Sequence, residues 1–215
     1  YNPIYTNLLS QADLIIALTE YERTELIQRF SLDPKRVAII PFGLDTLTVN
    51  RLNIRPGAFR QRYDIADPQR VVLYAGSKGV DKGAIDVLSV VSDLKRDDVT
   101  LVAIGLPTPD WNAKLETTRP NHLVDLGYIS EQEKWEAFAD CDIVAVPMRA
   151  NAFGLVFLEG WQFKKAVIGA LVGAASEIVQ NDVTGYLIPF GDRTALKQRL
   201  VELINNPDKA KQLGS

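Results

Sequence analysis

The segment from 147 to 163 carries the residues best suited to chemistry in this chain. An apolar stretch, Asp142–Val146, runs into a short turn, and Phe153–Leu155 then opens a predicted helix with a glycine in its centre. Such a helix start presents free backbone N–H groups that can bind an anion. Glu159 follows in the apolar part of this helix, and acidic side chains are almost never fully buried unless they are paired. We therefore expect Glu159 to face water or a ligand, so that a phosphate and a hydroxyl-rich group could share this place.

A glycine-rich turn with two lysines follows another apolar run, and its sequence is Gly76-Ser77-Lys78-Gly79-Val80-Asp81-Lys82-Gly83. It matches neither the G-x-G-x-x-G pattern nor a P-loop, since it has no Gly-Lys-Ser/Thr triplet. Its glycines allow the backbone to approach a ligand closely, and its lysines add positive charge for a phosphate. Two interpretations stay open, a phosphate-binding turn or a solvated loop whose lysines bind nothing.

Two further turns carry aromatic or acidic residues. Gly127–Ser130, which includes Tyr128 and Ile129, could hold a nucleotide base against its backbone, or be a plain turn with Tyr128 packed on the rim. Glu177 follows a turn of small residues, where the dipole of its own helix would favour a carboxylate. We interpret His122 as structural, and the three tryptophans as packing residues.

Short apolar runs alternate with helical patterns over most of the chain. Thr19 and Ser130 each stand three residues before a glutamate, which predicts capped helix starts, the first helix running to about Phe30. Further helices are predicted around 87–94 and from the N-cap Asp192 to near Asn206. The predicted strands are 14–18, 37–42, 71–75, 100–104, 122–126, 142–146, 166–169 and 185–188.

Near-continuously apolar strands separated by helices indicate a parallel sheet covered on both faces. We therefore predict an α/β fold with a Rossmann-like sheet over residues 70–215, preceded by a β-α-β unit in residues 1–45. Residues 46–69 lack the pattern and contain loop signals, so we expect a linker there, with a helical turn near 58–63. Ligands of such sheets bind outside the carboxyl ends of the strands, where the turns described above lie.

Composition excludes several classes of protein. The chain has 215 residues and a net charge of −3 without a strongly basic run, so nucleic acid is not an expected partner. Its apolar runs are too short for a transmembrane segment, and no charged-then-apolar leader is visible. Cys141 is the only cysteine and His122 the only histidine, which excludes an intrachain disulfide and a Cys/His metal cluster. We expect a cytoplasmic protein, whose full-length parent could lie peripherally at the inner face of a membrane.

Taken together, these segments resemble the retaining glycosyltransferases of family 4, also called glycosyl transferases group 1, which have the GT-B fold. The resemblance rests on five segments that occur in the family's order. They are Ala12–Glu20, Ile39–Asp45, Gly76–Gly83, Asn151–Glu159 as the E-x7-E motif, and Glu177–Val179 with Thr184–Pro189. The resemblance implies that residues 1–45 end the acceptor-side domain and that residues 70–215 form the domain that binds a nucleotide-diphosphate sugar.

The resemblance also implies a reaction. The family transfers a sugar from a nucleotide donor to an acceptor hydroxyl with retention at the anomeric carbon, using no metal or cofactor. Negative charge grows on the leaving diphosphate and must meet fixed positive charge. On this basis the expected catalytic residues are Lys82 and Glu159, with Glu159 accepting hydrogen bonds from the ribose. The other expected donor-binding residues are Gly76, Ser77, Lys78, Gly83, Tyr128, Ile129, Asn151, Phe153, Gly154 and Leu155.

The chain departs from the family in two positions and at its ends. Ser77 stands where the family has an arginine, with Lys78 beside it as a substitute, and Asn151 stands where the first glutamate of the motif is usual. Because the chain begins near the end of an acceptor-side domain and stops without the family's usual closing helices, we expect a fragment, truncated at its C-terminus as well, that binds the donor and is inactive alone. The acceptor, a sugar, a lipid or a polysaccharide, would bind through the missing domain. Two alternatives remain, a non-catalytic nucleotide-sugar-binding or scaffold protein, and a sugar-nucleotide 2-epimerase, which would need a histidine where only His122 is available.

Overall fold

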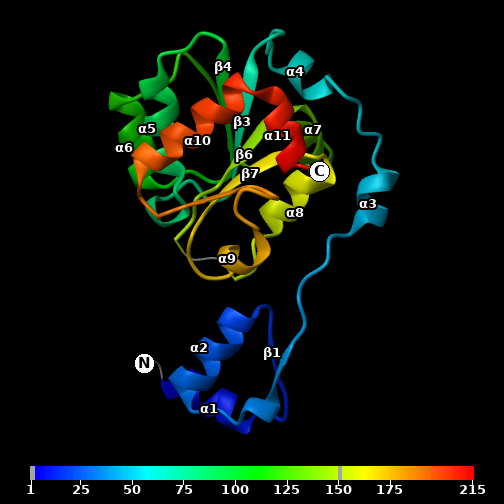
Figure 1. The fold of residues 1–215 in the computed structure, drawn as a ribbon, viewed down its shortest axis with the longest axis vertical. Helices are drawn as coiled ribbons and strands as arrows, with labels where there is room; N and C mark the ends of the chain where they lie inside the picture. The colour runs from blue at the N-terminus through cyan, green and yellow to red at the C-terminus, as the bar shows by residue number, and fades with distance from the viewer. Residues whose placement is uncertain (1–2, 150–151) are drawn as a thin grey trace.

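The protein consists of a small unit and a large domain joined by an extended segment (Figure 1). The computed structural model describes residues 3–149 and 152–215. The small unit, residues 3–42, contains α1 (Pro3–Gln11), β1 (Ile15–Ala17), α2 (Glu20–Phe30), the 3-10 helix η1 (Pro34–Arg36) and β2 (Val37–Ile39). Strands β1 and β2 pair in parallel, with Ile15 opposite Val37. The predicted β-α-β unit is thus confirmed, whereas α1 was not predicted.

Helix α2 begins where the sequence indicates. The Thr19 hydroxyl accepts a hydrogen bond from the backbone N–H of Glu22 at 3.1 Å, and Glu22 accepts one from the Leu18 N–H at 2.7 Å. These bonds satisfy N–H groups that have no partner within the helix or strand. These two bonds define where α2, the crossover helix between β1 and β2, begins.

The segment between the two parts is not structureless. It contains α3 (Thr46–Arg51) and α4 (Ala58–Arg62), of which only a helical turn at the second position was predicted. Val49, Phe59 and Ile65 are buried and belong to the hydrophobic core of the large domain. The segment expected as a linker therefore packs as part of the large domain. Burying its apolar side chains in that core removes them from water, which is favourable.

The large domain is built on a six-stranded sheet in which all neighbouring strands are parallel, with the order β5-β4-β3-β6-β7-β8. The strands are β3 (Arg70–Ala75), β4 (Val99–Ile104), β5 (His122–Leu126), β6 (Ile143–Ala145), β7 (Ala166–Ala170) and β8 (Tyr186–Ile188). The sheet confirms the predicted α/β fold, and each strand lies within about one residue of its predicted range. The strand order reverses between β3 and β6, and this reversal is the place where parallel sheets bind ligands.

Helices cover both faces of this sheet (Figure 1). They are the 3-10 helix η2 (Val80–Lys82), α5 (Ala84–Leu94), α6 (Pro109–Thr117), α7 (Glu131–Asp140), α8 (Leu155–Gln162), α9 (Ala175–Ile178), α10 (Arg193–Asn205) and α11 (Pro207–Leu213). Helix α5 packs against α6 and α10, whereas α7 packs against α4. The Thr108 hydroxyl caps α6 by accepting from the Trp111 N–H at 3.3 Å, a signal that the sequence analysis overlooked. Helix α11 was also not predicted.

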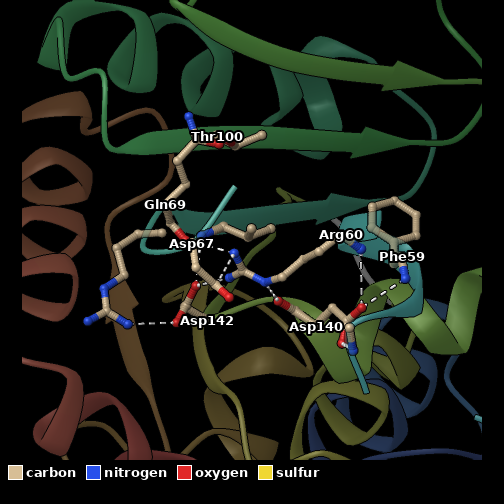
Figure 2. A network of polar contacts seen from close by, with 10 residues as sticks. Phe59, Arg60, Asp67, Gln69, Thr100, Asp140 and Asp142 are labelled. Atoms are coloured by element: carbon tan, nitrogen blue, oxygen red, sulfur yellow. Dashed lines mark hydrogen bonds and ion pairs between the residues drawn. The ribbon is translucent and has the colours of Figure 1, made fainter. Parts of the chain in front are cut away.

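A buried carboxylate at the end of α7 anchors α4, as Figure 2 shows. Asp140 is 7% exposed and accepts hydrogen bonds from the N–H groups of Gly57 at 2.6 Å and Phe59 at 2.9 Å. Arg60 then donates to the Asp140 carbonyl at 3.2 Å and to Asp142 at 3.1 Å. Asp142 also accepts from the Val71 N–H at 2.8 Å, which links α4 to the first strand of the sheet.

Asp140→Ala should lower the free energy of unfolding of the large domain by about 3 kcal/mol, because it leaves charge-assisted bonds to the start of α4 unmade. Urea denaturation followed by tryptophan fluorescence measures this. Asp93 is exposed on α5 without a polar partner among the described residues, so Asp93→Ala should change the value by less than about 0.5 kcal/mol. Equal stability of the two variants would contradict the anchoring role.

Candidate functional site

The turns after β3 and β6 touch each other at the carboxyl edge of the sheet. The Arg149 N–H donates to the Asp81 carbonyl at 2.8 Å. Gly83 lies against the chain after β6, and a Cβ at this position would come within 2.4 Å of the Pro147 carbonyl oxygen. Because β3 and β6 flank the reversal of strand order, these turns border the crevice in which ligands of such sheets bind.

Helices α5 and α8 follow the two turns that border this crevice, and each has a glycine as its N-cap. Gly83 precedes α5 with φ 72°, and Gly154 precedes α8 with φ 94°, both in the left-handed region that favours glycine. Neither glycine has a side chain that could cap the N–H groups of the first turn. The two helix starts therefore leave donors and the positive ends of two helix dipoles available to an anion.

Lys78 does not face this crevice. It is 1% exposed, and its ammonium donates to Asp125 at 2.5 Å and to the Leu126 carbonyl at 2.8 Å. It also lies 5.3 Å from the Trp111 ring, whose Nε1–H donates to the other oxygen of Asp125 at 3.1 Å. The expectation that Lys78 supplies charge to a phosphate in place of an arginine at position 77 is contradicted, because a buried ammonium needs the partners that it has here.

The rest of the glycine-rich turn is oriented by Tyr74 on β3. Its hydroxyl donates to the Ser77 carbonyl at 2.6 Å, and the same oxygen lies 3.4 Å from the Lys82 carbonyl. Burial raises the pKa of Tyr74, so the phenol remains a neutral donor. Gly76 and Ser77 are exposed and Lys82 is partly buried. The turn thus holds its backbone by a buried hydroxyl while Gly76 and Ser77 remain accessible to a ligand.

Glu159 lies on α8 and is paired with a residue that the sequence analysis did not single out. Lys134 of α7 donates to Glu159 Oε1 at 3.2 Å, and the Glu159 side chain is 17% exposed. The expectation that Glu159 faces only water or a ligand is therefore incomplete. The sequence held one weak signal for Lys134, a glutamate three residues earlier on the same helix, with which it forms an ion pair at 3.0 Å.

The turn between β5 and α7 confirms the predicted cap and exposes an aromatic ring. The Ser130 hydroxyl accepts from the Glu133 N–H at 3.2 Å. Tyr128 is 88% exposed, whereas Ile129 packs against the core. A ring this exposed is not packed on the rim as the plain-turn interpretation requires. Contact with a base remains a prediction for Tyr128 and Ile129.

The remaining predicted residues follow β6. Phe153 is buried and packs edge-on against Phe42 of the small unit with ring centroids 5.8 Å apart, while Leu155 is 40% exposed. Asn151 lies outside the residues that the structure describes. His122 begins β5, at the end of the strand away from the crevice, which agrees with its structural interpretation.

Glu177 joins the two parts of the molecule. Its carboxylate accepts from the Glu20 N–H at 2.9 Å and from the Tyr21 N–H, at the start of α2. The expected interaction with the dipole of its own helix is therefore not its main contact, because the first N–H groups of α2 need acceptors. A cavity of about 260 Å³ lies between α2 and Ala152. The small unit thus contacts the same edge of the sheet as the crevice.

Within residues 3–149 and 152–215, no group of three or more His, Cys, Asp or Glu residues could hold a metal ion. None of the helices described there is long and apolar enough to cross a membrane.

Comparison with known proteins identifies relatives of the chain. A family model described as glycosyl transferases group 1 matches residues 57–215. The O-antigen chain mannosyltransferase C of Escherichia coli is 25% identical over 219 residues, which cover 100% of this chain and 57% of that protein. The D-inositol 3-phosphate glycosyltransferase of Salinispora tropica is 28% identical over 229 residues, covering 95% of this chain and 46% of that protein. The chain spans about half the length of these curated relatives.

Solved structures share the fold. Anabaena HepE in complex with UDP-glucose has a TM-score of 0.86 at 23% identity, over 99% of this chain and 60% of that chain. WaaG, a glycosyltransferase involved in lipopolysaccharide biosynthesis, has a TM-score of 0.79 at 19% identity, over 93% of this chain and 55% of that chain. These matches confirm the predicted GT-B fold.

Lys78→Met should lower the free energy of unfolding by at least about 2 kcal/mol, because it leaves the carboxylate of Asp125 without its buried cation. Urea denaturation measures the change. Lys197 is exposed on α10 and has no ion-pair partner among the described residues, so Lys197→Met serves as the matched control. If Lys78→Met were as stable as this control, the structural role of Lys78 would be refuted.

Proposed function

Because the chain belongs to the glycosyl transferases group 1 family, we propose that its large domain binds a nucleotide-diphosphate sugar for retaining transfer to an acceptor hydroxyl. The observation that carries this proposal is the contact between the turns after β3 and β6, since each turn leads into a helix whose N-cap is a glycine without a capping side chain. A diphosphate is the kind of anion that such a pair of helix starts attracts.

The diphosphate would lie between Lys82 and the backbone N–H groups of Phe153, Gly154 and Leu155. Transfer of the sugar builds negative charge on the leaving diphosphate, and donors already fixed in place stabilise that charge without reorganising. Gly83 supports this assignment, because it allows the two turns to approach each other as closely as they do. Lys82 and Gly83 both belong to the turn that Tyr74 holds.

The nucleoside would lie towards α7. We propose that Glu159 accepts hydrogen bonds from the ribose hydroxyls, which suits a carboxylate that is largely buried yet still 17% exposed. The base would lie against Tyr128 and Ile129, where the exposed ring of Tyr128 is available for stacking. Gly76 and Ser77, from the turn after β3, are the further donor-binding residues that we propose. The resemblance also implies a contact of Asn151 with the donor sugar, but Asn151 lies outside the described residues.

A second candidate is a protein that binds a nucleotide sugar without turning it over. Ser77 favours it, since this side chain carries no charge where the resemblance expects an arginine. Lys78 cannot substitute, because its ammonium is buried against Asp125. An epimerase is less consistent with the geometry, since His122 lies at the far end of β5.

Acceptor recognition is proposed for the acceptor-side domain, to which residues 1–45 contribute. The small unit contacts the edge of the crevice through Phe42 and through the start of α2. An acceptor held on that side would therefore face the donor sugar. Assays of a polypeptide with the length of the curated relatives, for donor hydrolysis and for transfer, separate this enzyme from a non-catalytic binder.

The chain should bind a nucleoside diphosphate or its sugar ester with a saturable change in tryptophan fluorescence. Trp135 is the expected reporter, because its ring lies 4.5 Å from the Lys134 ammonium that pairs with Glu159. The first probes are UDP-glucose, GDP-mannose and ADP-glucose with the corresponding diphosphates, and UDP leads because Anabaena HepE was solved with UDP and UDP-glucose.

Glu159→Gln should weaken the tightest of these ligands about tenfold, because hydrogen bonds to a charged acceptor are lost. Glu116 is exposed on α6 without a polar partner among the described residues, so Glu116→Gln should bind as the unaltered chain does. Absence of saturable binding to every probe, or unchanged affinity in Glu159→Gln, would count against the proposed donor site.

A further inference from the structure

We propose that Lys134 is a positioning residue, which holds the carboxylate of Glu159 in the orientation that accepts the ribose hydroxyls of the nucleotide. The inference rests on the proposed function, since it assumes that a nucleotide occupies the crevice. It goes beyond that function because it assigns a role to a residue of α7 that belongs to none of the motifs on which the resemblance was based.

The Lys134 side chain is held at three points. Its ammonium lies 3.2 Å from Glu159 Oε1 and 3.0 Å from Glu131 Oε2, and 4.5 Å from the centre of the Trp135 ring. Glu131 and Trp135 belong to the same helix as Lys134, so the ammonium is fixed by its own helix and reaches across to α8. The pair therefore ties the rotamer of Glu159 to the neighbouring helix.

The geometry of the pair leaves half of the carboxylate for a ligand. Lys134 contacts Oε1 of Glu159, and within the described part of the chain Oε2 has no hydrogen-bond partner. A carboxylate has about four acceptor positions, so an oxygen bonded to one ammonium still accepts further hydrogen bonds. Two vicinal hydroxyls of a ligand could therefore donate to Oε2 and to the remaining lone pair of Oε1, and the Lys134 contact holds both oxygens in one orientation.

The environment of the pair makes it stronger than the exposed ion pairs of this protein. The side chains of Lys134 and Glu159 are 24% and 17% exposed, whereas exposed pairs contribute little because water screens them. Burial acts to lower the pKa of Lys134, but the carboxylates of Glu159 and Glu131 outweigh it and raise the pKa above its usual value. The ammonium consequently stays charged at neutral pH.

The sharpest test combines a change in the protein with a change in the ligand. Lys134→Met keeps an apolar stem against Trp135 and removes the charge, and Lys134→Arg restores a cation. The probes are UDP, GDP or ADP, whichever binds the unaltered chain most tightly, and its 2′,3′-dideoxy analogue. Lys209→Met is the matched control, because it breaks a lysine–glutamate pair, Lys209 with Glu202, between α11 and α10.

Lys134→Met should weaken the ribonucleotide five- to tenfold, roughly the loss of one charge-assisted interaction. It should leave the affinity for the dideoxy analogue unchanged, because that analogue lacks the hydroxyls on which a positioned Glu159 acts. Lys134→Arg should restore ribonucleotide binding to within about threefold, and Lys209→Met should bind both probes normally. If Lys134→Met folds poorly, Lys134→Gln replaces it, with the same expected result.

The outcomes separate this inference from the proposed function. Unchanged ribonucleotide binding in Lys134→Met, with a clear loss in Glu159→Gln, overturns the role of Lys134 and leaves the donor site intact. Equal weakening of both probes also overturns it, since that is the result of a merely structural contribution. If the unaltered chain binds no nucleotide, or if Glu159→Gln has no effect on binding, the proposed function fails and this inference fails with it.

Discussion

The close approach of two turns at the carboxyl edge of the sheet is the constraint on which the rest of the crevice depends. The turn after β3 lies against the chain after β6 only because position 83 has no side chain, since a Cβ would come within 2.4 Å of the Pro147 carbonyl oxygen. Helix α5 begins directly after the first of these turns, and α8 begins at Leu155, after the second. Both belong to the reversal point of the strand order, so one local contact places the donors of both helices where parallel sheets bind ligands.

Two buried charged residues, Lys78 and Asp140, stabilise the segments next to this edge of the sheet. Lys78 and Asp125 lock the glycine-rich turn to β5, and the Trp111 indole completes the arrangement. Asp140 fastens α4 to the end of α7. Each of these groups would be costly to bury alone, so each fixes its partner segment as strictly as apolar packing does.

The sequence predicted the elements that depend on local patterns and missed those that depend on distant partners. Apolar runs located all strands of the large sheet, and Thr19 and Ser130 located two helix starts. Helix α3 was missed because its six residues carry no clear periodicity. Lys78 was misjudged because its partner is 47 positions away in the sequence, and the pair of Lys134 and Glu159 spans 25 positions. A lysine in a glycine-rich turn suggests a phosphate site, and only the three-dimensional structure reveals that Lys78 is already paired with Asp125.

The central proposal for this molecule is that the crevice between the turns after β3 and β6 is a nucleotide-diphosphate site. A crystal structure of this chain with its tightest-binding nucleoside diphosphate tests that claim directly. We predict that the diphosphate lies between Lys82 and the start of α8, with the ribose hydroxyls within hydrogen-bonding distance of Glu159. A nucleotide bound elsewhere on the domain, or bound here with its ribose away from Glu159, would contradict it.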